Sequence, residues 1–381
     1  MVAALLLVRL ADEAGGFLPT GAFESIRADL GLSYTQAGVV LSAIAVGAIA
    51  GNGFAVAADH VSRRGICAGG ALAYASSLAI FAVADSFAAL LAAATVLGVA
   101  STAMVDAAEV ALVEAAEGDL PRALARQNLL GGIGDLLGPA ALIAADALGW
   151  SWRVVFAAGA VGLLAYGCWV ATLRFPPPAA HASGATARDG IRVVLRDPRV
   201  WVVGLLGLLL FPLDEPFLAF LIATLEHRGL GRGAATAVAA LAIVGALVEF
   251  ARRARVSRPA TADALVSSAA LLVATTLAVL VPWIPLVLVA AFVFGAAIAV
   301  FWVTLQAHMF TLHPGRVGTV KAAVTTIELG GFTIPVAAGA VADAAGVGAG
   351  LAVFTAVAVA LLAVSVLTRA GRRQARSDRA I

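Results

Sequence analysis

Apolar stretches recur along the whole chain and are separated by short polar segments. Each stretch is long enough to cross, as a helix, a hydrocarbon core of about 30 Å. The stretches lack the alternation of polar and apolar residues that is typical of a membrane β-barrel, and the chain has only 3 Tyr. We therefore predict an all-α polytopic membrane protein with 12 transmembrane helices, at residues 2–22, 35–57, 66–84, 87–115, 122–146, 152–174, 199–224, 233–251, 262–282, 284–311, 319–343 and 347–369.

The amino-acid composition agrees with a membrane protein. Of the 381 residues, 62% are hydrophobic and 13% are charged, whereas a soluble domain is about 25% charged. The first apolar stretch has no basic leader and is interrupted by Arg9, so we expect it to be retained as a span rather than cleaved as a signal peptide. Cys67 and Cys168 fall in separate predicted spans, without the spacing of metal ligands.

The distribution of basic residues predicts the orientation in the membrane. If the amino terminus is cytoplasmic, the inside loops and the tail hold 20 of the 25 Lys and Arg residues, and the outside loops hold 4. By the positive-inside rule we expect a multi-pass protein of the inner (plasma) membrane with both termini in the cytoplasm. The net charge of +2 follows from this topology, so no binding to nucleic acid is expected.

The longest inside connection divides the predicted spans six and six. It covers residues 175–198, is rich in Pro, Ala and Arg, and contains a predicted short amphipathic helix near 188–196. We predict an N-terminal six-helix bundle at 1–174, this cytoplasmic linker, a C-terminal six-helix bundle at 199–369 and a cytoplasmic tail at 370–381.

Local similarities between the two halves indicate an internal, pseudo-symmetric repeat. The acidic pair Asp12–Glu13 in span one has a counterpart in Asp214–Glu215 in span seven. AIAVGAIAGN in span two resembles LAIVGALVEF in span eight, and GDLLGPAALIAADALG in span five resembles GGFTIPVAAGAVADAAG in span eleven. Two halves around a central site are typical of secondary transporters.

Eight carboxylates lie within the predicted spans, where a charge that faces lipid costs on the order of 3 kcal/mol. They must face water, pair with a cation or bind a proton. Clustered carboxylates in a poorly solvated site are suited to carrying protons, so we regard these residues as candidates for binding protons and substrate. They are Asp12, Glu13, Asp106, Glu109, Asp135, Asp214, Glu215 and Glu328.

Few basic residues lie near these carboxylates in the sequence. Arg9 precedes Asp12 by three residues and Glu13 by four, so we expect an ion pair within the helix. Lys321 lies near the inner end of span eleven and is expected to neutralise little. We therefore predict a net acidic cavity, which favours a cation over an anion.

The kind of cation stays open at this point. Zinc and copper sites favour His, Cys or Met, which are almost absent near the acids, so no metal ligands are assigned. A harder divalent ion would accept oxygen ligands alone, and an organic cation would need aromatic walls. The aromatic residues near the acids are Phe17, Phe23, Phe217, Phe220, Phe301, Trp302 and Phe332.

Three short motifs occur in order along the first half of the chain. They are Asp59, Arg63 and Arg64 in ADHVSRRG, Gly134, Gly138 and Pro139 in a G-x-x-x-G-P pattern, and Trp152, Arg153 and Phe156 in GWSWRVVFAAGA. Together they resemble the major facilitator superfamily of transporters, and the resemblance extends over nearly the full length. The first span, followed by RADLGLS, is similar to that of the drug:proton antiporter branch.

This resemblance implies roles for the motif residues. Asp59 would pair with nearby arginines and meet the positive amino end of span eleven, which closes an inner gate. The glycines and proline of span five would serve helix packing or gating. The chain departs from the family pattern at Ala55, where a glycine is expected, and at Ala94, where many members carry an arginine used in proton coupling.

From these features we expect a secondary active transporter that works by alternating access, and we favour proton-coupled efflux of small cationic or amphiphilic compounds. The alternatives are a divalent-metal exporter, a proton-coupled sugar or amino-acid transporter, and a non-transporting receptor or scaffold. No nucleotide-binding G-x-x-x-x-G-K-[ST] loop or hydrolytic constellation is present, so we expect neither an enzyme nor a cofactor. The expected partners are the substrate, protons and the lipid bilayer, and the expected state is a monomer.

Overall fold

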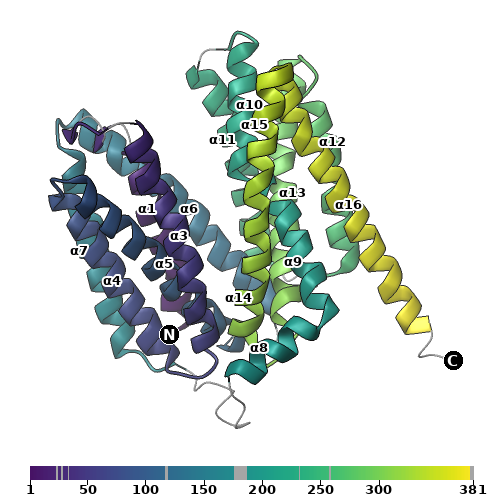
Figure 1. The fold of residues 1–381 in the computed structure, drawn as a ribbon. Helices are drawn as coiled ribbons and strands as arrows, with labels where there is room; N and C mark the ends of the chain where they lie inside the picture. The colour runs from purple at the N-terminus through teal and green to yellow at the C-terminus, as the bar shows by residue number, and fades with distance from the viewer. Residues whose placement is uncertain are drawn as a thin grey trace. The chain divides into compact units, whose positions relative to one another are not determined.

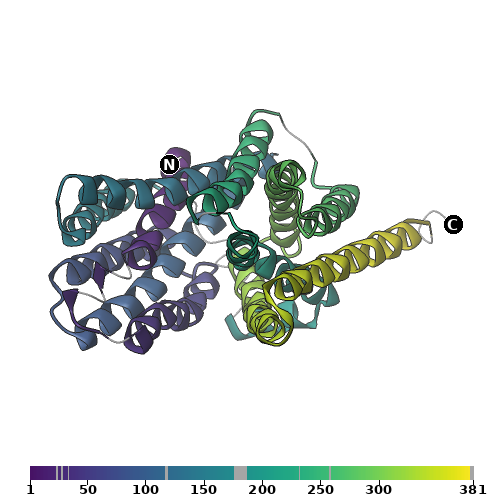
Figure 2. The same cartoon turned by 90° about the horizontal axis from the view of Figure 1, so that it is seen from above.

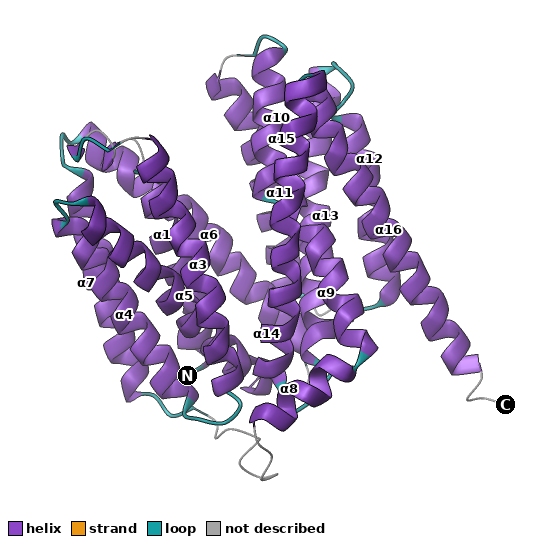
Figure 3. Ribbon diagram, in the orientation of Figure 1, coloured by secondary structure: helices purple, strands orange, loops and turns teal. Residues whose placement is uncertain are grey.

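The computed structural model is built of helices that follow the predicted spans (Figure 1). Within the part of the chain that it describes, every regular element is a helix (Figure 3). The described residues are 1–22, 25–26, 29–32, 34–115, 119–175, 187–230, 232–256 and 259–377.

Each of the six spans predicted for the first half is a single helix whose ends lie within 3 residues of the prediction. The amphipathic helix predicted in the linker is also present, as α8. The helices are α1 (Val2–Gly21), α3 (Tyr34–Ala57), α4 (Arg63–Val83), α5 (Phe87–Ala115), α6 (Leu120–Ala147), α7 (Trp152–Thr172) and α8 (Ala187–Arg196).

Four spans of the second half are also single helices, and α16 extends past its predicted end at residue 369. In Figure 2, α16 is the long yellow helix that leads to the C-terminus. The other two predicted spans, seven and eleven, are each divided by a short 3₁₀ segment. The elements are α9 (Pro198–Leu210), η2 (Phe211–Leu213), α10 (Glu215–His227), α11 (Arg232–Arg255), α12 (Ala262–Ala278), α13 (Ile284–Phe310), α14 (Val317–Glu328), η3 (Leu329–Phe332), α15 (Thr333–Ala345) and α16 (Val347–Ser377).

The prediction of continuous helices for spans seven and eleven is therefore wrong. In span seven, Pro212 lies in η2 and has no N–H group to donate, and Asp214 takes a non-helical conformation with φ −94° and ψ −122°. In span eleven, η3 contains Gly330 and Gly331, which favour the helical state less than other residues. Both breaks have a local cause in the sequence.

Seven helices within the described residues are long and apolar enough to cross a membrane, and two shorter apolar helices accompany them. Helix α1 is not among the seven because it carries three charged side chains. The seven are Arg63–Val83, Phe87–Ala115, Trp152–Thr172, Pro198–Leu218, Ile284–Phe310, Val317–Ala342 and Val347–Ala370.

Contacts divide the chain into two compact units. Unit 1 comprises Met1–Val194 together with His313–Ala322, and unit 2 comprises Leu195–Leu312 together with Ala323–Ile381. Helix α14 therefore begins in unit 1 and continues into unit 2. The predicted boundaries placed all of span eleven in the second half, so the assignment of its first residues to unit 1 differs from the prediction.

Each unit contains a close helix crossing that depends on glycine. In unit 1, a Cβ on Gly98 of α5 would overlap the carbonyl oxygen of Ile44 on α3. In unit 2, a Cβ on Gly295 of α13 would overlap the carbonyl oxygen of Ala242 on α11. These crossings involve the two segments whose sequences resemble each other, in spans two and eight, so the repeated sequence corresponds to a repeated packing arrangement.

An arginine also binds the end of a helix in each unit. Arg153, from the motif at the start of α7, donates a hydrogen bond to the carbonyl oxygen of Ala84 after α4, at 2.8 Å. Arg228 donates to the carbonyl oxygen of Leu280 after α12, also at 2.8 Å. The last carbonyl groups of a helix have no partner within it, so a charged donor stabilises them.

Candidate functional site

Three charged residues, Arg9, Asp12 and Glu13, lie within about one turn of α1. The Nη1 atom of Arg9 is 3.0 Å from Oε1 of Glu13 and 3.9 Å from Oδ2 of Asp12, which confirms the predicted ion pair within the helix. The guanidinium also reaches α5, where its Nη2 atom lies 3.1 Å from Oε1 of Glu109. Arg9 therefore connects the acidic pair of span one with an acid of span four.

The carboxylate of Asp12 has a further partner. The hydroxyl of Ser101 on α5 donates a hydrogen bond to Oδ1 of Asp12 at 2.5 Å, and the Tyr74 hydroxyl donates to the Asp12 backbone carbonyl at 3.1 Å. The side chain of Asp12 is 11% exposed, whereas that of Glu13 is 35% exposed. The adjacent carboxylates of this pair thus have different environments, because consecutive residues point to different sides of a helix.

Two carboxylates of α5 hold the ammonium group of Lys321. Asp106 and Glu109 are three residues apart and share a face of the helix. The Nζ atom of Lys321 lies 2.5 Å from Oδ1 of Asp106 and also contacts Oε2 of Glu109. Asp106, Glu109 and Lys321 are all buried.

The expectation that Lys321 neutralises little is wrong. It places a positive charge directly between two of the predicted acids, because α14 begins within unit 1 and packs there. One feature of the sequence could have indicated this role. Lys321 is the only lysine in a chain that otherwise uses arginine for its basic residues.

These side chains form one connected group, which we call the charge network. Its members are Arg9, Asp12, Glu13, Asp106, Glu109 and Lys321. Taking charges out of water costs several kcal/mol per ion unless pairing compensates, so mutual contacts are required here. Glu109 lies at the centre of the group, with one oxygen on Arg9 and the other on Lys321.

The remaining predicted acids are placed as follows. Asp135 lies on α6 in unit 1 and is exposed. In unit 2, Asp214 is exposed at the break before α10, and the side chain of Glu215 lies outside the described part of the structure. Glu328 ends α14, and its carboxylate lies so close to Gly207 on α9 that a Cβ on that glycine would overlap it.

Asp59 lies at the first turn of α14, as the family resemblance implies. Its carboxylate accepts hydrogen bonds from the backbone N–H groups of Gly318 at 3.0 Å and Thr319 at 2.8 Å, and from the Thr319 hydroxyl at 2.6 Å. Asp59 is 1% exposed. The first N–H groups of a helix have no helical partner and favour negative charge, so this contact is electrostatically favourable.

The predicted pairing of Asp59 with the neighbouring arginines is wrong. The guanidinium of Arg63 binds both carboxylate oxygens of Glu114, at 2.5 and 2.8 Å, and the backbone carbonyl of Ala58 at 2.9 Å. Arg64 is exposed. The Asp59 carboxylate is occupied by the first turn of α14, and the planar guanidinium of Arg63 binds the carboxylate of Glu114 at two points instead.

The glycines of the span-five motif support the packing of α6 against α1. A Cβ on Gly134 would lie 2.7 Å from the carbonyl oxygen of Leu10, and one on Gly138 would lie 3.0 Å from that of Ala14. The side chain of Pro139 lies outside the described part of the structure. This contact positions the turn of α1 that carries the acidic pair, and a gating role for the motif stays a prediction.

Two of the aromatic residues near the acids lie in the core of unit 2. Phe217 is buried in unit 2, where its ring lies 4.3 Å from that of Phe294 and 5.9 Å from that of Phe354. Phe301 is fully buried as well. Phe23 and the side chain of Phe332 lie outside the described part of the chain. Phe217 and Phe301 therefore serve packing.

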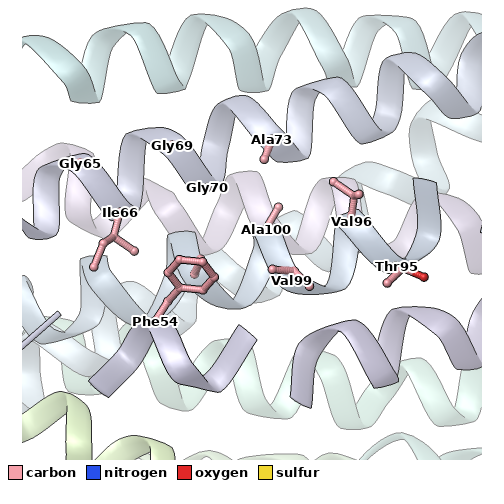
Figure 4. Close-up of a pocket in the computed structure, with 11 residues that line it drawn as sticks. Phe54, Gly65, Ile66, Gly69, Gly70, Ala73, Thr95, Val96, Val99 and Ala100 are labelled. Carbon is pink, nitrogen blue, oxygen red and sulfur yellow. The ribbon is translucent and has the colours of Figure 1, made fainter. Parts of the chain in front are cut away.

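An apolar groove of about 410 Å³ lies on α3, α4 and α5 of unit 1 (Figure 4). Phe54 and Ile66 line one part of it, and Val96 and Val99 line another. No member of the charge network lines this groove. Among the described residues, no group of three or more His, Cys, Asp or Glu side chains is placed to hold a metal ion.

The fold is similar to solved structures of membrane transporters. FucP, the E. coli fucose:proton symporter, has an outward structure that is 15% identical, with 96% of this chain and 98% of that chain covered and a TM-score of 0.79. The human organic anion transporter MFSD10 is 18% identical, with 96% and 98% covered and a TM-score of 0.73. The proton:xylose symporter XylE is 12% identical, with 97% and 95% covered and a TM-score of 0.78.

At these identities the likeness shows a shared fold and no more. A comparison with curated proteins gives no match. A family model described as Major Facilitator Superfamily matches residues 5–328, which is most of the chain. The sequence motifs, the helical architecture and this match agree, and the chain belongs to the major facilitator superfamily.

Proposed function

We propose that this chain is a proton-coupled secondary transporter that works by alternating access and exports small cationic or amphiphilic compounds in exchange for protons. The observation that carries the proposal is the charge network inside unit 1. Protons and substrate would use the same carboxylates at different stages of the cycle.

The charge balance of the network supports exchange. Its four carboxylates and two basic groups sum to −2 when all are ionised. A net charge in a poorly solvated interior is unfavourable, so added positive charge is stabilising. Protons and a cationic substrate can each supply that charge, and the replacement of one by the other is the elementary step of antiport.

Exposure suggests an order among the carboxylates. Glu13 has the most accessible side chain of the four, and Glu109 is almost fully enclosed at 1%. We assign Glu13 as the group that exchanges protons with water. Asp12 stands next to it and is held by the Ser101 hydroxyl, so it is assigned as the second proton-binding carboxylate.

A proton-coupled sugar symporter is the second candidate. FucP and XylE are described as symporters of fucose and of xylose with protons, and they share this fold. The Ser101 hydroxyl and the partly exposed carboxylate of Glu13 are also suitable partners for sugar hydroxyl groups. The two candidates differ in the charge of the substrate and in the direction of substrate movement relative to protons.

The orientation and the gate are part of the same proposal. We propose that the protein lies in the inner (plasma) membrane with both termini in the cytoplasm, because most of its basic residues lie in the loops and tail on that side. Asp59 and the start of α14 would then form an inner gate on the cytoplasmic side. The three hydrogen bonds of the Asp59 carboxylate support this assignment.

The test is solute flux in proteoliposomes under an imposed pH gradient, with a lipophilic cation, a divalent metal ion and a sugar as solutes. We expect cation movement opposite to protons, lost in Asp12→Asn and Glu13→Gln. Asp85→Asn is the matched control, because Asp85 is exposed in the α4–α5 loop, and it should transport normally. Sugar movement with protons would favour the second candidate. Metal movement alone, or no flux for any solute, would contradict both.

A further inference from the structure

Lys321 occupies the position that a positively charged substrate needs. Its ammonium group contacts one oxygen of Asp106 and one of Glu109, and the second oxygen of Glu109 is held by Arg9. The side chains of Asp106 and Glu109 are only 6% and 1% exposed. The ammonium group of Lys321 therefore already forms ion pairs with both carboxylates.

We propose that Lys321 is a specificity-determining residue of the charge network, a tethered occupant of the Asp106 and Glu109 carboxylates that exchanges with a free primary ammonium compound. This inference rests on the proposed function and narrows its substrate class from cations in general to protonated primary amines.

The chemistry of the occupant supports this class. An ammonium group is compact and carries three hydrogen-bond donors that can rotate toward two separate carboxylates. A guanidinium is planar and larger, and a quaternary ammonium has no N–H to donate. The chain has no other lysine, and its other ion pairs in unit 1 use the guanidinium groups of Arg9, Arg63 and Arg153, so Lys321 is the one ammonium donor among them.

The position of Lys321 on α14 means that the exchange would also change the contact between α14 and α5. Lys321 lies one residue before the end of the segment that belongs to unit 1, which closes at Ala322. Removal of a cation from a buried pair leaves uncompensated charge, so Lys321 can leave only if another cation or protons replace it. When Lys321 binds the two carboxylates, it connects the start of α14 to α5. When another cation or protons replace Lys321, this connection is lost.

The first experiment is chemical rescue of Lys321→Ala in detergent-purified full-length protein. We expect this variant to unfold at a lower temperature than the wild type and n-propylammonium to restore much of the loss. Tetramethylammonium should not do so. The triple variant Lys321→Ala, Asp106→Asn, Glu109→Gln should ignore both compounds, and Lys321→Arg should not respond to n-propylammonium, because its own side chain still fills the site.

Transport gives a second readout that a purely structural lysine would not change. In Lys321→Ala the internal competitor is absent, so the KM for a primary amine substrate should fall at least about tenfold, within the usual range of coupling between ligands. The turnover number should fall as well, because the carboxylates no longer have a cation that replaces the departing substrate. A fall in turnover alone would contradict the competition.

The wild type offers a third readout, which does not depend on the folding of any variant. Protein made with ¹³C-labelled lysine has one labelled side chain, because Lys321 is the only lysine. We expect n-propylammonium to shift its ε-methylene resonance and tetramethylammonium to leave it unchanged. An unchanged resonance at saturating n-propylammonium would overturn the inference.

These outcomes separate the inference from the proposed function. Rescue and the resonance shift, without gradient-driven flux of any solute, would support the exchange at Lys321 and contradict transport. Cation flux with neither rescue nor shift would support transport and overturn the exchange.

Discussion

The acidic pair of α1 and the acidic pair of the seventh span look alike in sequence and differ in structure. Asp12 and Glu13 lie in an uninterrupted helix, where Arg9 contacts both of them. Asp214 follows the 3₁₀ segment η2, has a non-helical backbone and is exposed. The pair in unit 1 is held by an ion pair within its helix, whereas Asp214 in unit 2 is exposed at a helix break.

The cause of this difference is local. The first pair has a basic residue one turn before it, which neutralises charge within the helix. The second pair is preceded by Pro212 and followed by Pro216, and proline removes a helical hydrogen bond. An acidic pair in an apolar stretch can therefore lie in a continuous helix with a basic partner or at a break in the helix. The neighbouring residues determine which of the two occurs.

The largest expected effect tests how much each acid contributes to the free energy of unfolding. Glu109→Ala should lower the free energy of unfolding by about 3–5 kcal/mol, because Arg9 and Lys321 both lose a buried partner. Asp214→Ala should lower it by less, because the side chain of Asp214 is exposed to solvent. Denaturant unfolding in detergent micelles measures both values. Equal losses in the two variants would remove the distinction between the units.

The next effect concerns the close helix crossing at a glycine that both units contain. Gly98→Ala and Gly295→Ala should each cost about 2 kcal/mol, because each new methyl group meets a backbone carbonyl oxygen of the neighbouring helix. The same unfolding measurement applies. Similar losses are expected because both crossings come from the repeated packing arrangement.

The controls for these glycines are Gly53→Ala in α3 and Gly339→Ala in α15, where a Cβ has open space around it. Alanine favours a helix over glycine by roughly 0.5–1 kcal/mol, so both controls should be neutral or slightly stabilising. A loss in the controls as large as at the crossings would show that crowding is not the cause.

The smallest effect compares two acids of corresponding segments, Asp59 just after α3 and Glu249 in the last two turns of α11. Asp59 binds the first turn of α14, whereas Glu249 pairs with Arg252 and Arg253 of its own helix. Asp59→Asn should slow turnover about fivefold, equivalent to about 1 kcal/mol, with little change in KM. Glu249→Gln should leave turnover within about twofold.

Initial rates in proteoliposomes measure this comparison, with unfolding in micelles as a check on folding. If Asp59→Asn weakens substrate affinity and leaves turnover unchanged, the gate assignment is wrong. A slowed Glu249→Gln variant would show that the two acids act alike.

Hydropathy alone predicted most of the fold, because every span must satisfy its backbone within a helix and bury an apolar surface in lipid. The breaks in spans seven and eleven were missed because the residues on both sides of each break are as apolar as those of a continuous helix. Pro212 and the two glycines of η3 were visible in the sequence, and they mark both positions.

The candidate site was predicted only where neighbours are close in sequence. The contacts of Arg9 on its own helix follow from helical spacing and are present. The contacts of Lys321 with α5 and of Arg63 with Glu114 join distant segments, so spacing along one helix contains no information about them. Position near the end of a span was a poor guide to burial.

The arginines that bind the ends of α4 and α12 bear on which substitutions the fold can tolerate. Arg153 and Arg228 fasten corresponding loops by main-chain carbonyl groups, which every residue type supplies. Neither arginine depends on the ionised side chains of the interior. Substitutions among the inner residues of either half therefore leave both of these contacts in place.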